Sequence, residues 1–383
     1  MSERRLRLLI VGGFPPPGRA VYGGIVTYCR TLLRSSLAAR VDLTLVDTTQ
    51  SAHPPPPVLV RAWLALKRMP SYVAALERSR PDAVILFVAA GMSVVDKGAM
   101  GWYARLRGVP ALLLPCGGPV LDACRRSRLA RLGVRCAFGG GRMMLCQGQA
   151  WQRFAIDMMG FAPEAAPIIP NWTASRELLE LGHARRPRAA APRALFAGWL
   201  DREKGIAELL EASRGLATQH RFTLYLAGEG NMSAAARAFV AEHRLEEVVR
   251  FCGWLPEEQL REQYAQADIF VLPSWSEGLP NALIEAMAAG LAIIATPVGN
   301  ITTAVEDGTS ALLVPPRDPV ALRGALERLL ADGELRQALG SAAHEVAALK
   351  FAAEPAVDRI IAAVKWAQEK VGRAGSRQGT ETD

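Results

Sequence analysis

Two glutamates, Glu277 and Glu285, stand eight residues apart in a segment rich in Gly, Pro and small apolar residues, 273–290. An apolar run, 269–272, precedes the segment as a buried strand would, and Pro280 favours the start of a helix. Two carboxylates at this spacing can hold the hydroxyl groups at both ends of one elongated ligand. The spacing alone also fits two ordinary surface acids, and the surrounding context favours a ligand site.

Groups that suit a phosphate accompany the two acids. The backbone N–H groups of Gly278 and Leu279 lie just before the expected helix, whose N terminus attracts negative charge. Arg202 and Lys204 occupy a turn after another apolar run, 194–197. Such cations can neutralise a diphosphate leaving group. Taken alone, the turn also fits a solvated charged loop.

Glycines precede an expected helix near the start of the chain. Gly23 and Gly24 end a loop rich in Gly and Pro, before a helix expected over 25–37. Without side chains, they permit a phosphate or a sugar to approach the helix N terminus closely. The alternative is that these Gly and Pro residues only form a turn between a strand and a helix.

Four arginines recur at three- and four-residue spacing, which predicts one basic stripe on a single helix. The stripe is either a solvated face or a surface that meets anionic lipid or a pyrophosphate-linked acceptor. Its members are Arg125, Arg128, Arg131 and Arg135.

Short apolar runs alternate with amphipathic stretches along the whole chain, which predicts an α/β fold with parallel sheets covered by helices. We expect strands at 8–11, 43–46, 83–88, 111–114, 143–146, 168–169, 194–197, 222–227, 249–251, 269–272, 292–295 and 311–314.

A charged, Pro-containing segment, 184–192, has the composition of a linker. It separates an N-terminal domain, 1–183, from a C-terminal domain, 193–354. A final amphipathic helix is expected over 355–371. The polar end of the chain, 372–383, is expected to be disordered.

Composition narrows the class of protein. Half of the 383 residues are hydrophobic and the net charge is +8, with about +15 in residues 1–190 and about −7 in the rest. No nucleic-acid-binding signature accompanies the basic half, and no apolar run is long enough to span a membrane. The first apolar run is too short for a signal peptide. Six cysteines without a C-x-x-C pair indicate reduced thiols in a cytoplasmic protein and no zinc ribbon.

Together these motifs resemble glycosyltransferase family 4, whose fold is GT-B, with two Rossmann-like domains facing across a cleft. The resemblance is strongest from Phe196 to Pro316. It implies that Glu277 contacts the donor sugar, Glu285 holds the ribose, and Gly278 and Leu279 bind the diphosphate. It also implies nucleotide contacts at the turn of Gly228 and Gly230 and near Trp254 and Leu255, although Trp254 fits the core equally well.

For the first domain, the resemblance implies that Gly23 and Gly24 lie close to donor and acceptor, and that Lys97, Cys116 and Gly117 face the acceptor. Two positions depart from the family pattern. Trp199 stands where the family has Arg, so Arg202 is the candidate replacement, and Cys116 stands where the family has His.

The implied activity is retaining, metal-independent transfer of a sugar from a nucleoside-diphosphate sugar to a glycan. By the resemblance, the glycan is carried on a lipid at the inner face of a bacterial membrane, in cell-surface polysaccharide synthesis. No cofactor or metal is expected, and the sequence contains no D-x-D motif. The competing hypothesis is a non-catalytic GT-B protein that binds nucleotide sugar or a partner enzyme. A sugar-nucleotide epimerase would need acid–base residues in the first domain that the sequence does not identify.

Overall fold

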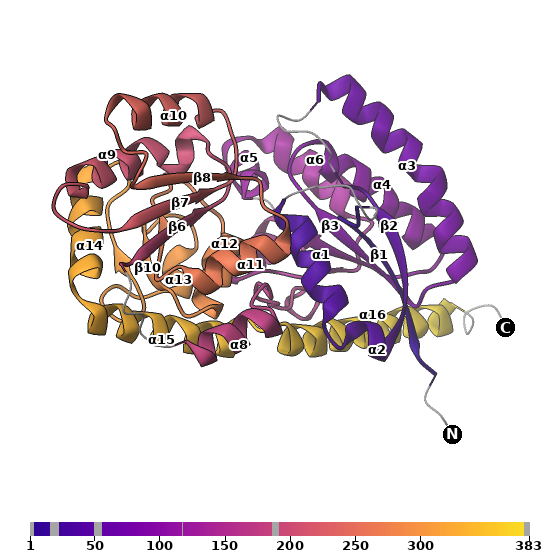
Figure 1. The fold of residues 1–383 in the computed structure, drawn as a ribbon. Helices are drawn as coiled ribbons and strands as arrows, with labels where there is room; N and C mark the ends of the chain where they lie inside the picture. Colours follow the sequence, from indigo (N-terminus) through magenta and orange to yellow (C-terminus); the bar gives the residue numbers. More distant parts are fainter. Residues whose placement is uncertain (1–3, 16–22, 50–55, 117, 186–190, 379–383) are drawn as a thin grey trace. The chain divides into compact units, whose positions relative to one another are not determined.

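The computed structural model describes residues 4–15, 23–49, 56–116, 118–185 and 191–378 (Figure 1). The chain forms two compact units. The first combines Met1–Trp172 with Ala353–Asp383, and the second is Thr173–Ala352. Among the described residues, no helix combines the length and the hydropathy of a membrane span.

The first unit contains a five-stranded parallel sheet in the order β2-β1-β3-β4-β5. Side chains alternate between its two faces, because successive residues of a strand point to opposite sides. In β1, Leu9 and Val11 enter one core and Leu8 and Ile10 enter the other. The strands are β1 (Leu6–Gly12), β2 (Val41–Asp47), β3 (Ala83–Val88), β4 (Ala111–Pro115) and β5 (Met143–Met144).

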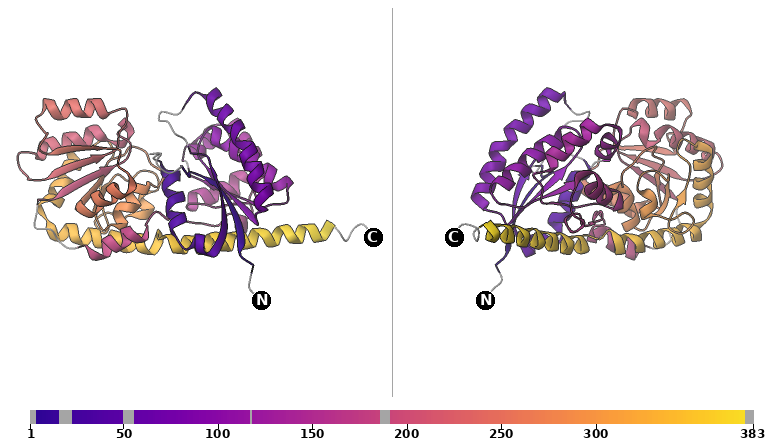
Figure 2. Two further views of the ribbon diagram at one scale, coloured as in Figure 1. Left: turned by 45° about the vertical axis from the view of Figure 1, so that its right-hand side comes forward. Right: turned by 180° about the vertical axis from the view of Figure 1, so that it is seen from behind.

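Helices cover both faces of this sheet (Figure 2). One face packs against α3 (Val58–Ser79), α4 (Met92–Leu106), α5 (Pro119–Arg126) and α6 (Arg128–Phe138). The other face packs against α1 (Gly24–Arg34) and α16 (Ala353–Gln378). Two short helices, α2 (Leu37–Arg40) and α7 (Gln149–Arg153), complete the helical elements of this unit, together with a π-helical turn at Phe154–Met159 and a 3-10 turn at Pro163–Ala165.

The final helix belongs to the first unit. In α16, Val357 and Ile360 are buried in the core beneath the sheet, and Asp358 pairs with Arg40 at 2.6 Å. The helix runs to Gln378, beyond residue 371, where the sequence predicted its end. Residues 379–383 lie outside the described part of the chain.

The second unit contains a six-stranded parallel sheet in the order β11-β10-β9-β6-β7-β8. Its strands are β6 (Arg193–Ala197), β7 (Thr223–Ala227), β8 (Val249–Gly253), β9 (Ile269–Leu272), β10 (Ala292–Ala295) and β11 (Leu312–Leu313). Its helices are α8 (Arg176–Ala184), α9 (Ile206–Leu216), α10 (Ser233–Glu242), α11 (Glu257–Gln266), α12 (Asn281–Ala288), α13 (Ile301–Ala304), α14 (Pro319–Ala331) and α15 (Gly333–Lys350).

The prediction of two α/β domains with parallel sheets is confirmed, but the boundary lies earlier than predicted. The second unit begins at Thr173 rather than after residue 183. The reason is α8, which packs on α12 and α15 of the second unit. A Cβ atom on Gly182 would lie 2.2 Å from the Ala288 carbonyl oxygen, so only glycine permits this packing. Of the predicted linker, 186–190 lies outside the described residues.

Two smaller expectations also change. The helix expected over 25–37 ends at Arg34, and α2 begins at Leu37. The strand expected at 168–169 is reduced to one bridge between Ile168 and Cys146.

Candidate functional site

Loops from five neighbouring strands meet at one edge of the second sheet. Because β6 to β10 are parallel, their carboxyl ends lie on the same side, where ligands of open α/β sheets bind. The loops after β6 and β9 carry Lys204 and Glu277, and α12 carries Glu285. The sheet therefore brings together residues that the sequence separates by up to about 80 positions.

Glu277 and Lys204 form an ion pair at this edge. Lys204 Nζ lies 2.6 Å from Glu277 Oε1, and the Ser274 hydroxyl donates to the same oxygen at 2.7 Å. The Glu277 side chain is 8% exposed and that of Lys204 is 26% exposed, so the pair is shielded yet reachable. Ser274 is itself buried, and its carbonyl oxygen accepts from the Thr296 hydroxyl at 2.5 Å. The carboxylate is thus held from three elements.

Two glycines allow the loops of this pair to approach each other. Gly205 has φ of 72°, and a Cβ atom there would lie 2.1 Å from the Pro273 carbonyl oxygen. Gly299 has φ of 60°, and its Cβ would lie 1.9 Å from the Glu277 carbonyl oxygen. Both the left-handed backbone and the contact require glycine. The next residue, Asn300, donates its N–H to the Gly278 carbonyl at 2.8 Å, which fixes the loop after Glu277.

The predicted glycine turn lies beside the first loop. A Cβ atom on Gly228 would lie 1.8 Å from the Gly198 carbonyl oxygen, and one on Gly230 would lie 2.6 Å from Leu200. Leu200 also receives a hydrogen bond from the Met232 N–H at 2.8 Å and donates its own N–H to Glu229. These glycines therefore join the loops after β6 and β7 edge to edge.

Trp254 packs on Trp199, the residue that departs from the family pattern. Their ring centroids are 4.4 Å apart with an interplanar angle of 76°. Both rings are half-buried, and the neighbouring Leu255 packs on the core of the unit. Trp199 thus supports the loop after β8 rather than supplying a charge.

Glu285 lies among buried groups in α12. The Tyr264 hydroxyl donates to Glu285 Oε2 at 2.9 Å. Burial raises the pKa of Glu285 to about 7, the Tyr264 hydrogen bond opposes the shift, and the nearby charge of Glu257 adds to it. Because burial makes ionisation of this carboxyl group costly, a ligand that donates hydrogen bonds to it would stabilise the ionised form.

Arg202 lies beside an aromatic ring of the loop after β9. Its guanidinium sits 5.6 Å from the centre of the Trp275 ring, and that of Arg317 lies 4.4 Å from the same ring. The Trp275 indole N–H donates to Glu208 at 3.0 Å. The structure therefore brings Lys204 to Glu277 and places Arg202 on a neighbouring aromatic surface.

Several contributors were missed from the sequence. Ser274 and Trp275 lie inside the segment 273–290, where their position just after the strand end was the available signal. Gly299 follows the expected strand 292–295 and was assigned no role from the sequence. Tyr264 and Arg317 had no sequence signal, because only the fold brings them next to Glu285 and Trp275.

In the first unit, Lys97 is buried rather than exposed to a ligand. Its ammonium group lies 2.8 Å from Asp96 Oδ2, and both side chains are almost fully enclosed. Burial lowers the pKa of Lys97, while the charge of Asp96 opposes that shift. Among the described residues, Asp96 Oδ1 has no hydrogen-bond partner.

The remaining predicted residues of the first unit lie near strand ends. Gly23 immediately precedes α1 and Gly24 is its first residue. Cys116 follows β4, where its thiol donates to the Leu114 carbonyl at 3.5 Å. Burial raises the pKa of Cys116 well above the ordinary value, so this thiol is neutral. Gly117 lies outside the described residues.

The expectation of one arginine stripe on a single helix is wrong. Arg125 belongs to α5, and a break at Ser127 separates it from the three arginines of α6, because the Ser127 hydroxyl caps α6 by accepting from the Ala130 N–H. Arg131 turns back and donates from Nε and Nη2 to the Cys124 carbonyl at 3.2 and 3.1 Å. Arg125, Arg128 and Arg135 remain exposed.

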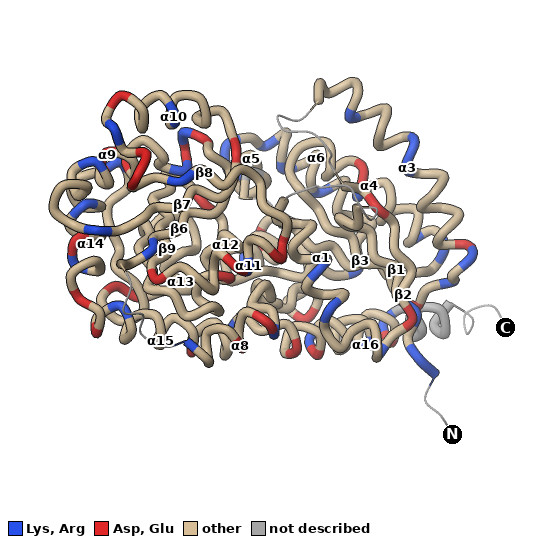
Figure 3. The backbone as a smooth tube through the Cα atoms, viewed as in Figure 1, with Lys and Arg blue, Asp and Glu red and all other residues tan. Residues whose placement is uncertain are grey.

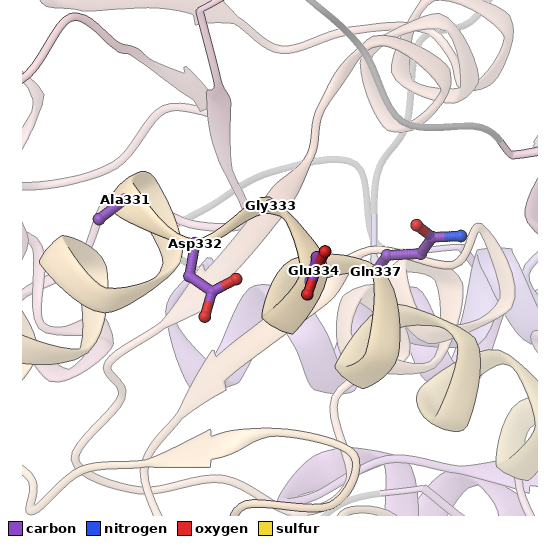
Figure 4. A pocket seen from close by; sticks show the side chains of 5 residues that line it. All are labelled: Ala331, Asp332, Gly333, Glu334 and Gln337. Carbon is purple, nitrogen blue, oxygen red and sulfur yellow. The ribbon is translucent and has the colours of Figure 1, made fainter.

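A surface hollow lies at the turn between α14 and α15, away from these loops. Figure 4 shows its lining of Ala331, Asp332, Gly333, Glu334 and Gln337. The Asp332 carboxylate caps α15 by accepting from the Leu335 N–H at 2.9 Å. The Asp332 carboxylate therefore has a structural role. The hollow contains none of the predicted site residues.

The sequence of the second unit matches a known family. Residues 191–332 match the model of glycosyl transferases group 1. The amylovoran biosynthesis glycosyltransferase AmsK of Erwinia amylovora is 35% identical over 144 residues, which are 36% of this chain and 35% of that protein. Across AmsK and two further curated relatives, the matches span only about a third to a half of the relatives' lengths.

Solved structures match over nearly the whole chain. Sucrose-phosphate synthase from Thermosynechococcus elongatus has a TM-score of 0.73 at 22% identity, covering 93% of this chain and 97% of that one. HepE of Anabaena, solved with UDP and glucose, has a TM-score of 0.68 at 17% identity, covering 94% and 100%. Structural similarity at 17–22% sequence identity establishes the fold alone. The chain therefore has the GT-B fold of these proteins, and its second unit is similar in sequence to the group 1 glycosyl transferases.

Proposed function

We propose that the protein is a retaining, metal-independent glycosyltransferase whose second unit binds a nucleoside-diphosphate sugar. The observation that carries the proposal is the ion pair of Lys204 and Glu277, held at the carboxyl edge of the second sheet by Ser274. The group 1 match over the same residues supports it. HepE, which has this fold, was solved with UDP and glucose.

Glu277 is suited to hold the donor sugar. Among the described residues, both hydrogen bonds to its carboxylate end on Oε1. Oε2 can accept a hydrogen bond from a sugar hydroxyl without disturbing the contacts that orient the side chain. Such fixed polar groups position a substrate before reaction and need little reorganisation.

Lys204 and the start of α12 are suited to the diphosphate. Lys204 is partly exposed beside Glu277, and the N-cap residue of α12, Pro280, makes no side-chain capping hydrogen bond among the described residues. Its ammonium group, the backbone after Glu277 and the helix N terminus stabilise the charge that develops as the nucleoside diphosphate leaves. The sugar C1–O bond to the diphosphate breaks as the acceptor oxygen bonds to C1 on the same face. The acceptor proton passes to the leaving phosphate.

Glu285 is suited to the ribose. Its buried carboxylate already accepts from Tyr264, and two ribose hydroxyls donating to it would stabilise the ionised form. We propose that the acceptor is a lipid-linked glycan held by the first unit, in cell-surface polysaccharide synthesis. AmsK takes part in amylovoran biosynthesis, which supports this acceptor class.

The donor is identified by thermal-shift screening of UDP-, GDP-, ADP- and dTDP-sugars. A donor that binds the folded state raises the melting temperature by mass action. We expect one nucleotide class to do so, and Glu285→Ala to abolish the shift while Glu258→Ala, an exposed acid on α11, retains it. An equal shift in the Glu285→Ala variant would reject the ribose assignment.

Transfer itself is tested with the donor so identified. Release of the nucleoside diphosphate should require an acceptor glycan, persist in EDTA, and give a product with the anomeric configuration of the donor by NMR. Donor binding without any release in the presence of acceptor glycans would favour the non-catalytic alternative.

A further inference from the structure

The outer surface of the α3, α4 and α6 layer in the first unit is apolar where a solvated surface is expected. Of the thirteen exposed large apolar side chains among the described residues, eleven belong to the first unit, and ten of these eleven lie on the three helices. We call these ten residues the apolar layer: Val58, Leu59, Val60, Trp63 and Leu66 on α3, Val95, Trp102 and Leu106 on α4, and Leu129 and Leu132 on α6.

Helical spacing places these residues on the outward side. Leu59, Trp63 and Leu66 follow each other at four and three residues along α3, and their exposed fractions are 83%, 54% and 74%. The inward side of the same helix carries Tyr72 and Leu76, which are buried. Contiguous exposed apolar surface of this kind marks an interaction site.

The three helices form one continuous layer. The Tyr72 hydroxyl donates to the Met100 carbonyl at 2.9 Å and joins α3 to α4. The Trp102 indole donates to the Cys136 carbonyl at 2.8 Å and joins α4 to α6. Because α3 and α4 are the next helices after the parallel strands β2 and β3, both begin toward the carboxyl edge of the sheet, where an acceptor would be bound.

Cations accompany the apolar residues. Lys67 lies over the Trp63 ring at 3.7 Å, and Arg105 lies over the Trp102 ring at 5.3 Å. Acidic residues are rare along these helices (Figure 3). Only two acids, Glu77 and Asp96, occur in the three helices, and both are paired with cations. Aromatic rings with long cationic side chains beside them are typical of surfaces at a membrane interface.

We propose that the apolar layer docks on an anionic lipid membrane, with Trp63 and Leu66 entering the interface and Lys67 and Arg105 meeting lipid phosphates. A symmetric dimer through this surface would place these cations against the same cations of a second copy, whereas lipid phosphates neutralise them. This inference rests on the proposed function, in which the acceptor is linked to a lipid. Docking would bring such an acceptor to the edge of the first sheet.

The test is co-sedimentation of the full chain with phosphatidylcholine vesicles, with and without 30% phosphatidylglycerol, in the absence of sugar donor. We expect binding to the anionic vesicles and at least tenfold weaker partition for Leu59→Ser/Trp63→Ser/Leu66→Ser. The control Val320→Ser/Leu349→Ser removes the two exposed large apolar side chains among the described residues of the second unit and should retain wild-type binding. Melting temperatures report whether each variant is folded.

A second variant tests the charges without changing the apolar residues. Lys67→Glu/Arg105→Glu should weaken binding to anionic vesicles severalfold and leave binding to neutral vesicles unchanged. Equal binding by the triple Ser variant, or no vesicle binding by the wild type, would overturn the proposal. Vesicle binding needs no donor, so this failure is distinct from failure of sugar transfer.

Discussion

The carboxyl edges of the two sheets differ in how they use charge. In the second unit, Lys204 and Glu277 come from loops after β6 and β9 and meet at a partly exposed position. In the first unit, Asp96 and Lys97 are neighbours on α4 and are buried, and Cys116 after β4 is a neutral thiol. The second edge therefore presents charges to a ligand, whereas the first keeps its charges inside.

The outer surfaces of the two units differ in the number of exposed apolar side chains. The second unit has two exposed large apolar side chains among its described residues, Val320 and Leu349, and the first has eleven. This contrast indicates that the two units have different partners. A charged edge suits a nucleotide sugar, and an apolar, cationic layer suits a lipid surface.

The largest effect on the charged edge of the second sheet is expected from Glu277→Gln. The amide can still accept from Ser274 but loses the charge that pairs with Lys204, so we expect turnover to fall about a thousandfold, or about 4 kcal/mol in transition-state stabilisation. Steady-state transfer assays measure this loss. Glu258→Gln, an exposed acid of the same unit, should keep wild-type turnover. Comparable turnover in the Glu277→Gln variant would remove the functional contrast between the two edges.

The next test concerns how tightly the loops of the second edge are packed. Gly299 and Gly308 share a left-handed backbone, with φ of 60° and 70°, but only Gly299 contacts the Glu277 backbone. Gly308→Ala should cost about 1 kcal/mol of stability from the backbone alone. Gly299→Ala adds the clash and should cost about 3 kcal/mol with loss of activity. Thermal unfolding and transfer assays compare the two, and equal costs would show that the loop contact is loose.

A pH test follows from Glu285. Its pKa of about 7 lies above the ordinary 4.5, so the folded protein binds this proton more tightly than the unfolded chain. The stability associated with that proton is present below pH 4.5 and is lost as pH rises through 7. Glu285→Gln should therefore gain about 1–3 kcal/mol relative to wild type between pH 5 and pH 8. Melting temperatures at both pH values measure this, and a pH-independent difference would contradict the buried carboxyl group.

The smallest effect is expected at the first edge. Cys116→Ser removes a neutral thiol whose contacts, to the Leu114 carbonyl and Gln147, a hydroxyl can largely replace. We expect turnover within about threefold of wild type, less than 1 kcal/mol. A loss approaching that of Glu277→Gln would show that the first edge also supplies a reacting group.

The sequence determined most of the secondary structure. Runs such as 269–272 and 292–295 became β9 and β10 with unchanged bounds, because strands buried on both faces read as continuous apolar stretches. The order of strands and helices, in turn, is typical of parallel sheets. The motif around Glu277 and Glu285 was visible for the same reason, since a strand end, a Gly-Pro turn and a helix start are local signals.

Only the tertiary structure decided which distant groups meet. Ser274 and Lys204 share one oxygen of Glu277, Tyr264 orients Glu285, and Gly299 fits against the Glu277 backbone because parallel strands bring their loops to one edge. The packing around each helix was also not predictable from the sequence, since helical periodicity identifies a face but not what covers it. In the folded protein Lys97 is enclosed, Arg131 donates to a backbone carbonyl oxygen, and the apolar residues of α3 remain exposed.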